Sequence, residues 1–250
     1  MRNLAMFISY NGAHYHGYQL QKNGVTVEGM LRQAVGRIFG KGITIYGCSR
    51  TDAGVHARNF CINFHTESTI DCDAAVRAMN ANLPADIAVK SCRQVPEAFH
   101  ARFSCRGKRY VYQILNSRVK DPFLVDMAWQ CPYPIDEGLA DRAARDFIGT
   151  HDFTAFCAAG AQVKDKVRTI YDCSVTREGN LVLFSVCGDG FLYNMVRIMA
   201  GTLLYVTQGK IPPDGIPAIL SSRDRARAGI TLPPEGLYLD EVFYDREALG

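Results

Sequence analysis

The densest group of chemically versatile residues lies at 47–58, which reads Gly-Cys-Ser-Arg-Thr-Asp-Ala-Gly-Val-His-Ala-Arg. Arg50 and Asp52 stand two positions apart between two strand-like stretches, so we expect a turn that exposes both side chains. A carboxylate placed there can act as a nucleophile or a base, and the guanidinium can hold a phosphate or steady the carboxylate. On these residues alone, a structural Asp-Ala-Gly turn with an incidental surface ion pair is the favoured interpretation.

A second group lies in the segment 100–112, where cations alternate with three aromatic residues, Phe103, Tyr110 and Tyr112. Cations suit backbone phosphates and aromatic rings suit unstacked bases, so the composition fits looped or single-stranded RNA. A strand with a charged face toward solvent is the alternative. The cations that the RNA interpretation selects, here and in a second basic cluster, are Arg102, Arg106, Lys108, Arg109, Lys164, Lys166 and Arg168.

The third feature is an apolar segment at 191–206 with Arg197 near its middle. A helix that is apolar nearly all round is expected to be buried. A buried arginine without a partner costs about 3–5 kcal/mol, so we expect a carboxylate to meet it, and Asp52 is one candidate. A structural pair with another acid, or a side chain that reaches the surface, also fits this sequence.

Two other kinds of site are weakly supported. His14 and His16 would share one face of a strand, as two metal ligands do, but no nearby Cys or acidic cluster completes a ligand set. A metal-dependent hydrolase that uses both histidines with Asp52 is therefore a minor hypothesis. The sequence contains neither a phosphate-binding loop nor the elbow of an acyl hydrolase. We expect no metal and no cofactor.

Composition points to a soluble cytoplasmic protein. The formal net charge is only +3, so an RNA partner would require positive charge concentrated on one surface. The nine cysteines are scattered and form no Cys-x-x-Cys pair, which is typical of thiols in a reducing compartment. The longest apolar stretch is too short to span a bilayer, and we expect no membrane association.

Hydrophobic patterning predicts an alternation of strands and helices in the first hundred residues. Expected in order are a strand at 4–10, a helix capped by Thr26 and closed by Gly40, strands at 43–48 and 59–65, a helix from Asp73 that ends before Pro84, and a strand at 86–95. This is a β-α-β-β-α-β order.

The second half repeats the order without a matching sequence repeat. Expected are a strand at 108–115, a helix capped by Asp136, strands at 168–176 and 181–187, a helix at 191–206 and a strand at 237–244. We therefore predict an α+β protein with two ferredoxin-like halves, 1–105 and 106–250. Their sheets would join into one mostly antiparallel sheet, with helices on one side and a catalytic cleft between the halves. The pattern also predicts long loops at 11–25, 116–134, 149–166 and 207–236. Each of them is either a binding surface or an ordinary surface loop.

At this level of detail the sequence resembles the TruA-type tRNA pseudouridine synthases. The run Ser49-Arg-Thr-Asp-Ala-Gly-Val-His-Ala57 is similar to the signature of that family. Further blocks that resemble family motifs are Phe99-His-Ala-Arg-Phe-Ser104, Lys108-Arg-Tyr-Val-Tyr112, His151-Asp-Phe-Thr-Ala-Phe156, Arg168-Thr-Ile170, Gly190–Leu204 and Ala228–Leu239. One departure is Cys48-Ser49, where small glycine or alanine residues are expected before the arginine.

The resemblance implies a cofactor-free isomerase in which Asp52 starts to break the glycosidic bond of a flipped-out uridine. It implies that Tyr110 stacks on the target base, and that Arg197 pairs with Asp52 and keeps it ionised. Arg50 would help to extrude the base, and Leu237 would line the pocket beside the uracil. Arg58 is a further candidate substrate contact.

The resemblance also implies a target and an assembly state. Uridines at positions 38, 39 and 40 of the tRNA anticodon stem-loop would be modified by a homodimer whose groove holds the tRNA. Two weakly basic faces side by side would strengthen the field of a chain with so small a net charge. A non-catalytic RNA-binding protein on the same fold is the main alternative.

Overall fold

The computed structural model describes residues 1–161 and 163–249. Its backbone contacts divide the chain into two compact units, one formed by Met1–Gly107 with Tyr238–Gly250 and the other by Lys108–Leu237. The first unit is therefore discontinuous in sequence, because the last strand of the chain groups with the N-terminal residues.

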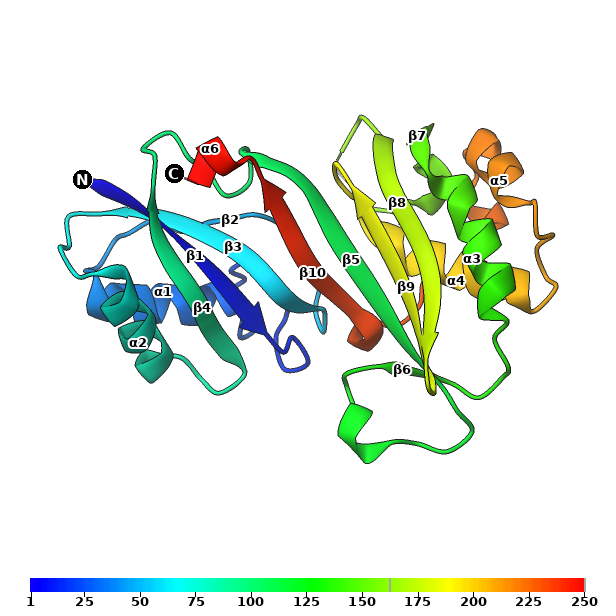
Figure 1. Cartoon of the computed structure of the whole chain (residues 1–250), viewed down its shortest axis with the longest axis horizontal. Helices are drawn as coiled ribbons and strands as arrows, with labels where there is room; N and C mark the ends of the chain where they lie inside the picture. Colours follow the sequence, from blue (N-terminus) through cyan, green and yellow to red (C-terminus); the bar gives the residue numbers. More distant parts are fainter. Residues whose placement is uncertain (162, 250) are drawn as a thin grey trace. The chain divides into compact units, whose positions relative to one another are not determined.

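The first unit has the strand order of a ferredoxin-like fold (Figure 1). Its elements are β1 (Arg2–Tyr10), α1 (Val27–Ile38), β2 (Tyr46–Gly47), β3 (His56–Thr66), α2 (Cys72–Asn82), β4 (Ile87–Val95), β10 (Leu237–Tyr244) and α6 (Arg246–Leu249). β1 pairs antiparallel with both β3 and β4. β2 pairs antiparallel and β10 parallel with β3. Figure 1 shows α1 and α2 together on one face of this sheet.

Local chemistry explains where these helices begin. The Thr26 hydroxyl accepts a hydrogen bond from the Gly29 backbone N–H, so the predicted cap is confirmed. α2 starts one residue earlier than predicted, because Asp71 caps it by accepting from the Ala74 N–H at 2.8 Å.

The strands that flank the Asp52 turn differ more from the prediction. β2 contains only Tyr46 and Gly47, since Gly40 and Gly42 adopt φ values of +109° and +83° and the chain is still turning there. β3 begins at His56, earlier than expected. The irregular segment around Asp52 is thus shorter than its sequence suggests.

Most strands of the second unit also pair antiparallel. Its elements are β5 (Cys105–Asn116), β6 (Trp129–Cys131), α3 (Glu137–Ala144), β7 (Gly149–Asp152), β8 (Val167–Glu178), β9 (Leu181–Gly188), α4 (Met195–Thr207) and α5 (Ile216–Ser222), with single 3-10 turns at Pro122–Leu124, Arg145–Phe147, Thr154–Phe156, Arg225–Arg227 and Pro234–Gly236. β5, β9, β8 and β7 pair antiparallel in this order, and β6 pairs parallel with β5.

Two sequence expectations in this unit are corrected. The helix predicted at 191–206 begins only at Met195, because Asn194 adopts a left-handed conformation with φ 58° that cannot continue a helix. β6, β7 and α5 lie within segments expected to be loops, since each is too short to show a clear period. Asp136 caps α3 as predicted.

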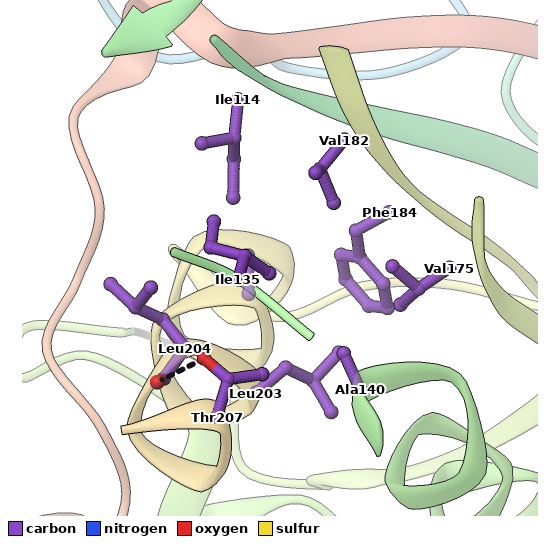
Figure 2. A pocket seen from close by; sticks show the side chains of 10 residues that line it. Ile114, Ile135, Ala140, Val175, Val182, Phe184, Leu203, Leu204 and Thr207 are labelled. Atoms are coloured by element: carbon purple, nitrogen blue, oxygen red, sulfur yellow. Dashed lines mark hydrogen bonds between the residues drawn. The ribbon is translucent and has the colours of Figure 1, made fainter. Parts of the chain in front are cut away.

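The core of the second unit lies between its sheet and helices α3 and α4. Figure 2 shows Ile114, Val175 and Phe184 of the sheet pointing toward Leu203 and Leu204 of α4, around a small apolar space. The only polar side chain that lines this space, Thr207, donates to the Leu204 carbonyl at 2.8 Å. α4 is therefore held by apolar packing on one side, which fixes the position of Arg197.

Candidate active site

Asp52 opens a tight turn. The Val55 N–H donates to the Asp52 carbonyl at 3.1 Å, and Gly54 has φ +78°, the conformation that a type II turn requires at its third position. The Asp52 side chain is partly exposed. The glycine of the Asp-Ala-Gly sequence thus has a conformational role, as the turn interpretation expected.

The loop at 11–25 holds this turn from outside. The Tyr18 N–H donates to the Thr51 carbonyl at 3.1 Å, and the Gly54 N–H donates to the Tyr15 carbonyl at 3.3 Å. A Cβ on Gly17 would lie 2.6 Å from the Thr51 carbonyl oxygen, so only glycine permits this close approach. Main-chain contacts on both sides therefore fix the backbone of the turn that carries Asp52.

A stacked group follows the turn on β3. The buried His56 ring stacks on Tyr238 with centroids 4.6 Å apart, and the Arg58 guanidinium lies 4.6 Å from the centre of the same tyrosine ring. Arg58 also forms an ion pair with Asp240 at 3.1 Å. Burial raises the pKa of Tyr238 to about 12. Contacts with β10 thus pre-position Arg58, a predicted substrate contact. The other predicted arginine of this region, Arg50, is exposed.

Arg197 in the second unit is partly exposed and is held by two hydrogen bonds. Its Nε donates to the Leu232 carbonyl at 2.6 Å and its Nη1 donates to the Asn194 side-chain oxygen at 2.7 Å. The expected fully buried arginine is therefore half-buried, within a helix that is otherwise buried as predicted. The pairing of Arg197 with Asp52 stays a prediction.

The segment that supplies the Leu232 carbonyl lies directly against α4. The Thr202 hydroxyl accepts from the Gly229 N–H at 2.8 Å. A Cβ on Gly201 would lie 1.9 Å from the Ile230 carbonyl oxygen. The pattern Ala-Gly-Thr inside an apolar helix is the sequence signal for such an approach, and the sequence prediction overlooked it.

Among the aromatic residues predicted to meet bases, Tyr110 and Tyr112 are buried. Tyr110 is 6% exposed and contacts Phe191 edge-on, with centroids 5.0 Å apart. Tyr112 has no exposed surface, and its hydroxyl donates to the Pro233 carbonyl at 2.7 Å. Tyr112 thus holds the segment that also binds Arg197, and the idea that its ring meets a base is wrong. Leu237 is buried as well.

The predicted RNA-binding cations have different environments. Arg102 and Lys164 are exposed, while Arg106 pairs with Asp245 at 2.7 Å in a solvent-exposed contact. Arg168 donates to the Asp165 carbonyl at 3.1 Å. Half-exposed positions are occupied by Lys108, Arg109, Lys166 and Arg168.

Other kinds of site find no support in the described part of the chain. No three His, Cys, Asp or Glu side chains among residues 1–161 and 163–249 are grouped to hold a metal ion. No helix within these residues is long and apolar enough to cross a membrane. All nine cysteines are thiols.

Comparisons with known proteins agree on one family. Residues 6–104 and 143–245 match the family described as tRNA pseudouridine synthase. The matched ranges include Asp52, Arg197 and Leu237, while Tyr110 lies outside them. The chain is 47% identical to the tRNA pseudouridine synthase A of Acetivibrio thermocellus, over 98% of this chain and 100% of that protein. It is 43% identical to the same enzyme of Thermoanaerobacter pseudethanolicus over equal shares. The Geobacillus enzyme is 44% identical, over 95% of this chain and 96% of its own.

Proposed function

Because this chain belongs to the tRNA pseudouridine synthase family, we propose that it isomerises uridine to pseudouridine in tRNA with the Asp52 carboxylate as its catalytic group. The observation that carries the assignment to Asp52 is the rigid turn that presents it. Three main-chain hydrogen bonds fix the turn, at the carbonyls of Thr51 and Asp52 and at the Gly54 N–H. A carboxylate on a fixed backbone loses less freedom when it meets its substrate.

The reaction requires one bond to break and another to form within the same nucleotide. Asp52 starts cleavage of the C1′–N1 bond of a uridine that has left the base stack. The uracil then turns and joins C1′ through C5, the C5 hydrogen leaves as a proton, and N1 gains one. No electrons enter or leave, so the isomerisation needs no redox partner.

Other residues receive supporting roles in this proposal. Tyr110 stacks on the target base, Arg197 keeps the Asp52 carboxylate ionised, and Leu237 lines the uracil pocket. Arg197 is suited to its role because two hydrogen bonds hold its guanidinium in place. Arg50 is exposed and able to follow an extruded base, and Arg58 adds a positioned cation at β3.

The target that we propose is the anticodon stem-loop, at positions 38, 39 and 40. Flipping a base costs a few kcal/mol and is easier beside a loop than within a duplex. The enzyme acts as a homodimer in the cytoplasm. Two copies double the positive charge that faces one tRNA.

The variant Asp52→Asn tests the catalytic assignment. We expect tRNA affinity within about threefold of wild type and a loss of turnover of at least about a thousandfold, because binding groups remain while the reacting carboxylate is absent. The measurement is tritium release from C5 of uridine-labelled tRNA, beside a binding titration. Asp73→Asn, which makes the same charge change at an exposed position of the first unit, is the control and should keep full turnover.

The outcomes separate this function from its rivals. Wild-type turnover in Asp52→Asn would show that another group does the chemistry. Binding without tritium release by the wild-type protein, across several tRNAs, would favour a non-catalytic RNA-binding protein. Activity that disappears in excess chelator would favour a metal-dependent enzyme.

A further inference from the structure

Three aromatic rings form a ladder on the surface of the first unit, one from Tyr46, shortly before the Asp52 turn, and two from the distant segment 100–103. The ring of Tyr46, on β2, lies 4.6 Å from that of His100, and the His100 ring lies 4.4 Å from that of Phe103. The rings are tilted by 43° and 36° relative to their neighbours. Phe103 is 77% exposed and Tyr46 is 37% exposed, so the ladder ends in a largely exposed aromatic side chain.

The segment that carries the ladder is anchored from beneath. Asn63, fully buried, accepts from the Ala101 N–H at 2.8 Å and donates to the Phe99 carbonyl at 3.2 Å. Asn3 donates to the same carbonyl at 2.9 Å. Phe99 and Ala101 point into the core, which leaves the alternate residues at the surface.

The turn itself fixes the outermost ring. The His100 Nδ1 accepts from the Arg102 N–H at 3.1 Å and from the Phe103 N–H at 3.4 Å, and the Ser104 hydroxyl accepts from the His100 N–H at 3.1 Å. Burial, helped by the nearby Arg102 charge, lowers the pKa of His100, which keeps its ring neutral and able to accept. The backbone at Phe103 is therefore held in place, while its mostly exposed ring lies against that of His100.

A cation accompanies the open end of the ladder. The Arg102 guanidinium lies 5.8 Å from the centre of the Phe103 ring, and Arg102 is itself exposed. An exposed flat ring beside a cation matches the two parts of a nucleotide, since bases stack on aromatic faces and phosphates pair with arginine. A purely apolar partner would give Arg102 no counterpart.

We infer that Tyr46, His100 and Phe103 form a stacking platform for an unpaired base of the RNA substrate, with Arg102 beside it for the adjoining phosphate. The platform binds substrate and takes no part in bond breaking. This inference rests on the proposed tRNA substrate. It changes the sequence interpretation, in which Phe103, Tyr110 and Tyr112 were equivalent, because Phe103 alone among them has an exposed ring.

Variants at Phe103 test the platform. In Phe103→Ala, we expect tRNA affinity to fall by about 5- to 150-fold, the range for removal of one base–aromatic stack. Phe103→Trp keeps a ring and should bind within about threefold of wild type. Phe103→Leu keeps an apolar side chain without a ring face and should bind as weakly as the alanine variant. Phe123→Ala, which removes a 93% exposed phenylalanine outside the ladder, is the matched control and should bind like wild type.

Kinetics and salt titrations separate a platform from other roles. Phe103→Ala should raise KM and leave kcat within about twofold, because a stack formed equally in the ground and transition states affects only binding. Its loss of affinity should be similar at low and high salt, whereas Arg102→Gln should lower the salt slope. Wild-type affinity in Phe103→Ala, or in Phe103→Leu, would overturn the platform.

The same samples distinguish this inference from the proposed function. Wild-type protein that forms no pseudouridine would contradict the function itself. Normal pseudouridine formation together with normal binding by Phe103→Ala would contradict only the platform. A change of oligomeric state in Phe103→Ala, measured by sedimentation, would also overturn it, in favour of a contact between copies of this chain.

Discussion

At the scale of single residues, Asn63 connects the core of the first unit to its surface. Its side chain lies on the central strand β3, donates to Asn3 and to the Phe99 carbonyl, and accepts from the Ala101 N–H. All of its polar atoms are thus satisfied by groups that are themselves buried or half-buried. A buried polar group of this kind specifies one position for the segment that it binds.

Replacement of Asn63 by Ala should destabilise the protein by about 2–4 kcal/mol, because it leaves the buried Ala101 N–H unsatisfied and removes three hydrogen bonds. The measurement is the free energy of unfolding in urea. Asn59→Ala, on the same strand, should change stability by about 0.5 kcal/mol or less. Equal losses in the two variants would mean that the network does not anchor the 96–104 segment.

Residue identity predicted the Asp52 turn well, since Asp-Ala-Gly between strands is a local pattern and Gly54 has the expected positive φ. It did not distinguish Tyr112 from Phe103, because aromatic residues suit a buried sheet and an exposed stack alike. The difference depends on the partner of each ring, the Pro233 carbonyl for Tyr112 and His100 for Phe103. Those partners are distant in sequence or lie across a turn, where periodicity carries no signal.

At the scale of elements, the contact between α4 and the segment 228–232 positions Arg197. Gly201 and Gly229 meet backbone to backbone, and the Leu232 carbonyl that follows binds the Arg197 Nε. Because the helix that carries Arg197 is packed against this segment and the guanidinium is hydrogen-bonded to it, the positive charge points in one direction. The glycine in the middle of the helix is therefore retained despite its poor helix propensity.

Gly201→Ala should destabilise the protein by about 1–3 kcal/mol or more and lower turnover, because a Cβ would collide with the Ile230 carbonyl oxygen. Thermal unfolding and tritium release measure the two effects. Gly36→Ala in α1 is the matched control, since a Cβ there meets nothing within 4 Å. That variant should gain up to about 1 kcal/mol from the better helix propensity of alanine. A neutral Gly201→Ala would show that α4 and the segment can separate without cost.

The order of the long elements could be predicted because each shows a clear period over eight or more residues, as in β10, whose bounds match the expected 237–244. Shorter elements such as β6 and α5 gave no period and were missed. The start of α4 was wrong because a left-handed Asn194 is a backbone conformation, while its apolar neighbours resemble a helix. Sequence thus predicted the long elements, and the capping geometry decided where they begin.

At the scale of the whole molecule, a chain with a net charge of only +3 has to bind a polyanionic substrate. Some cations already have acidic partners, such as Arg58 with Asp240 and Arg106 with Asp245. These pairs are solvent-exposed and weak, so a phosphate can replace the carboxylate at small cost. The positive charge available to RNA is therefore larger than the ion pairs of the protein without RNA suggest.

Affinity for tRNA should fall by about tenfold or more between 50 and 200 mM salt, because each phosphate contact releases counterions. Arg106→Gln should lower the slope of log affinity against log salt by about 0.7–0.9, as expected for the loss of one contact. Arg145→Gln, which removes an exposed arginine paired with Asp141 in the second unit, is the control and should keep the wild-type slope. A flat response of the wild-type protein would mean that phosphates contribute little to binding. A wild-type slope in Arg106→Gln would mean that Arg106 stays with Asp245 when tRNA is bound.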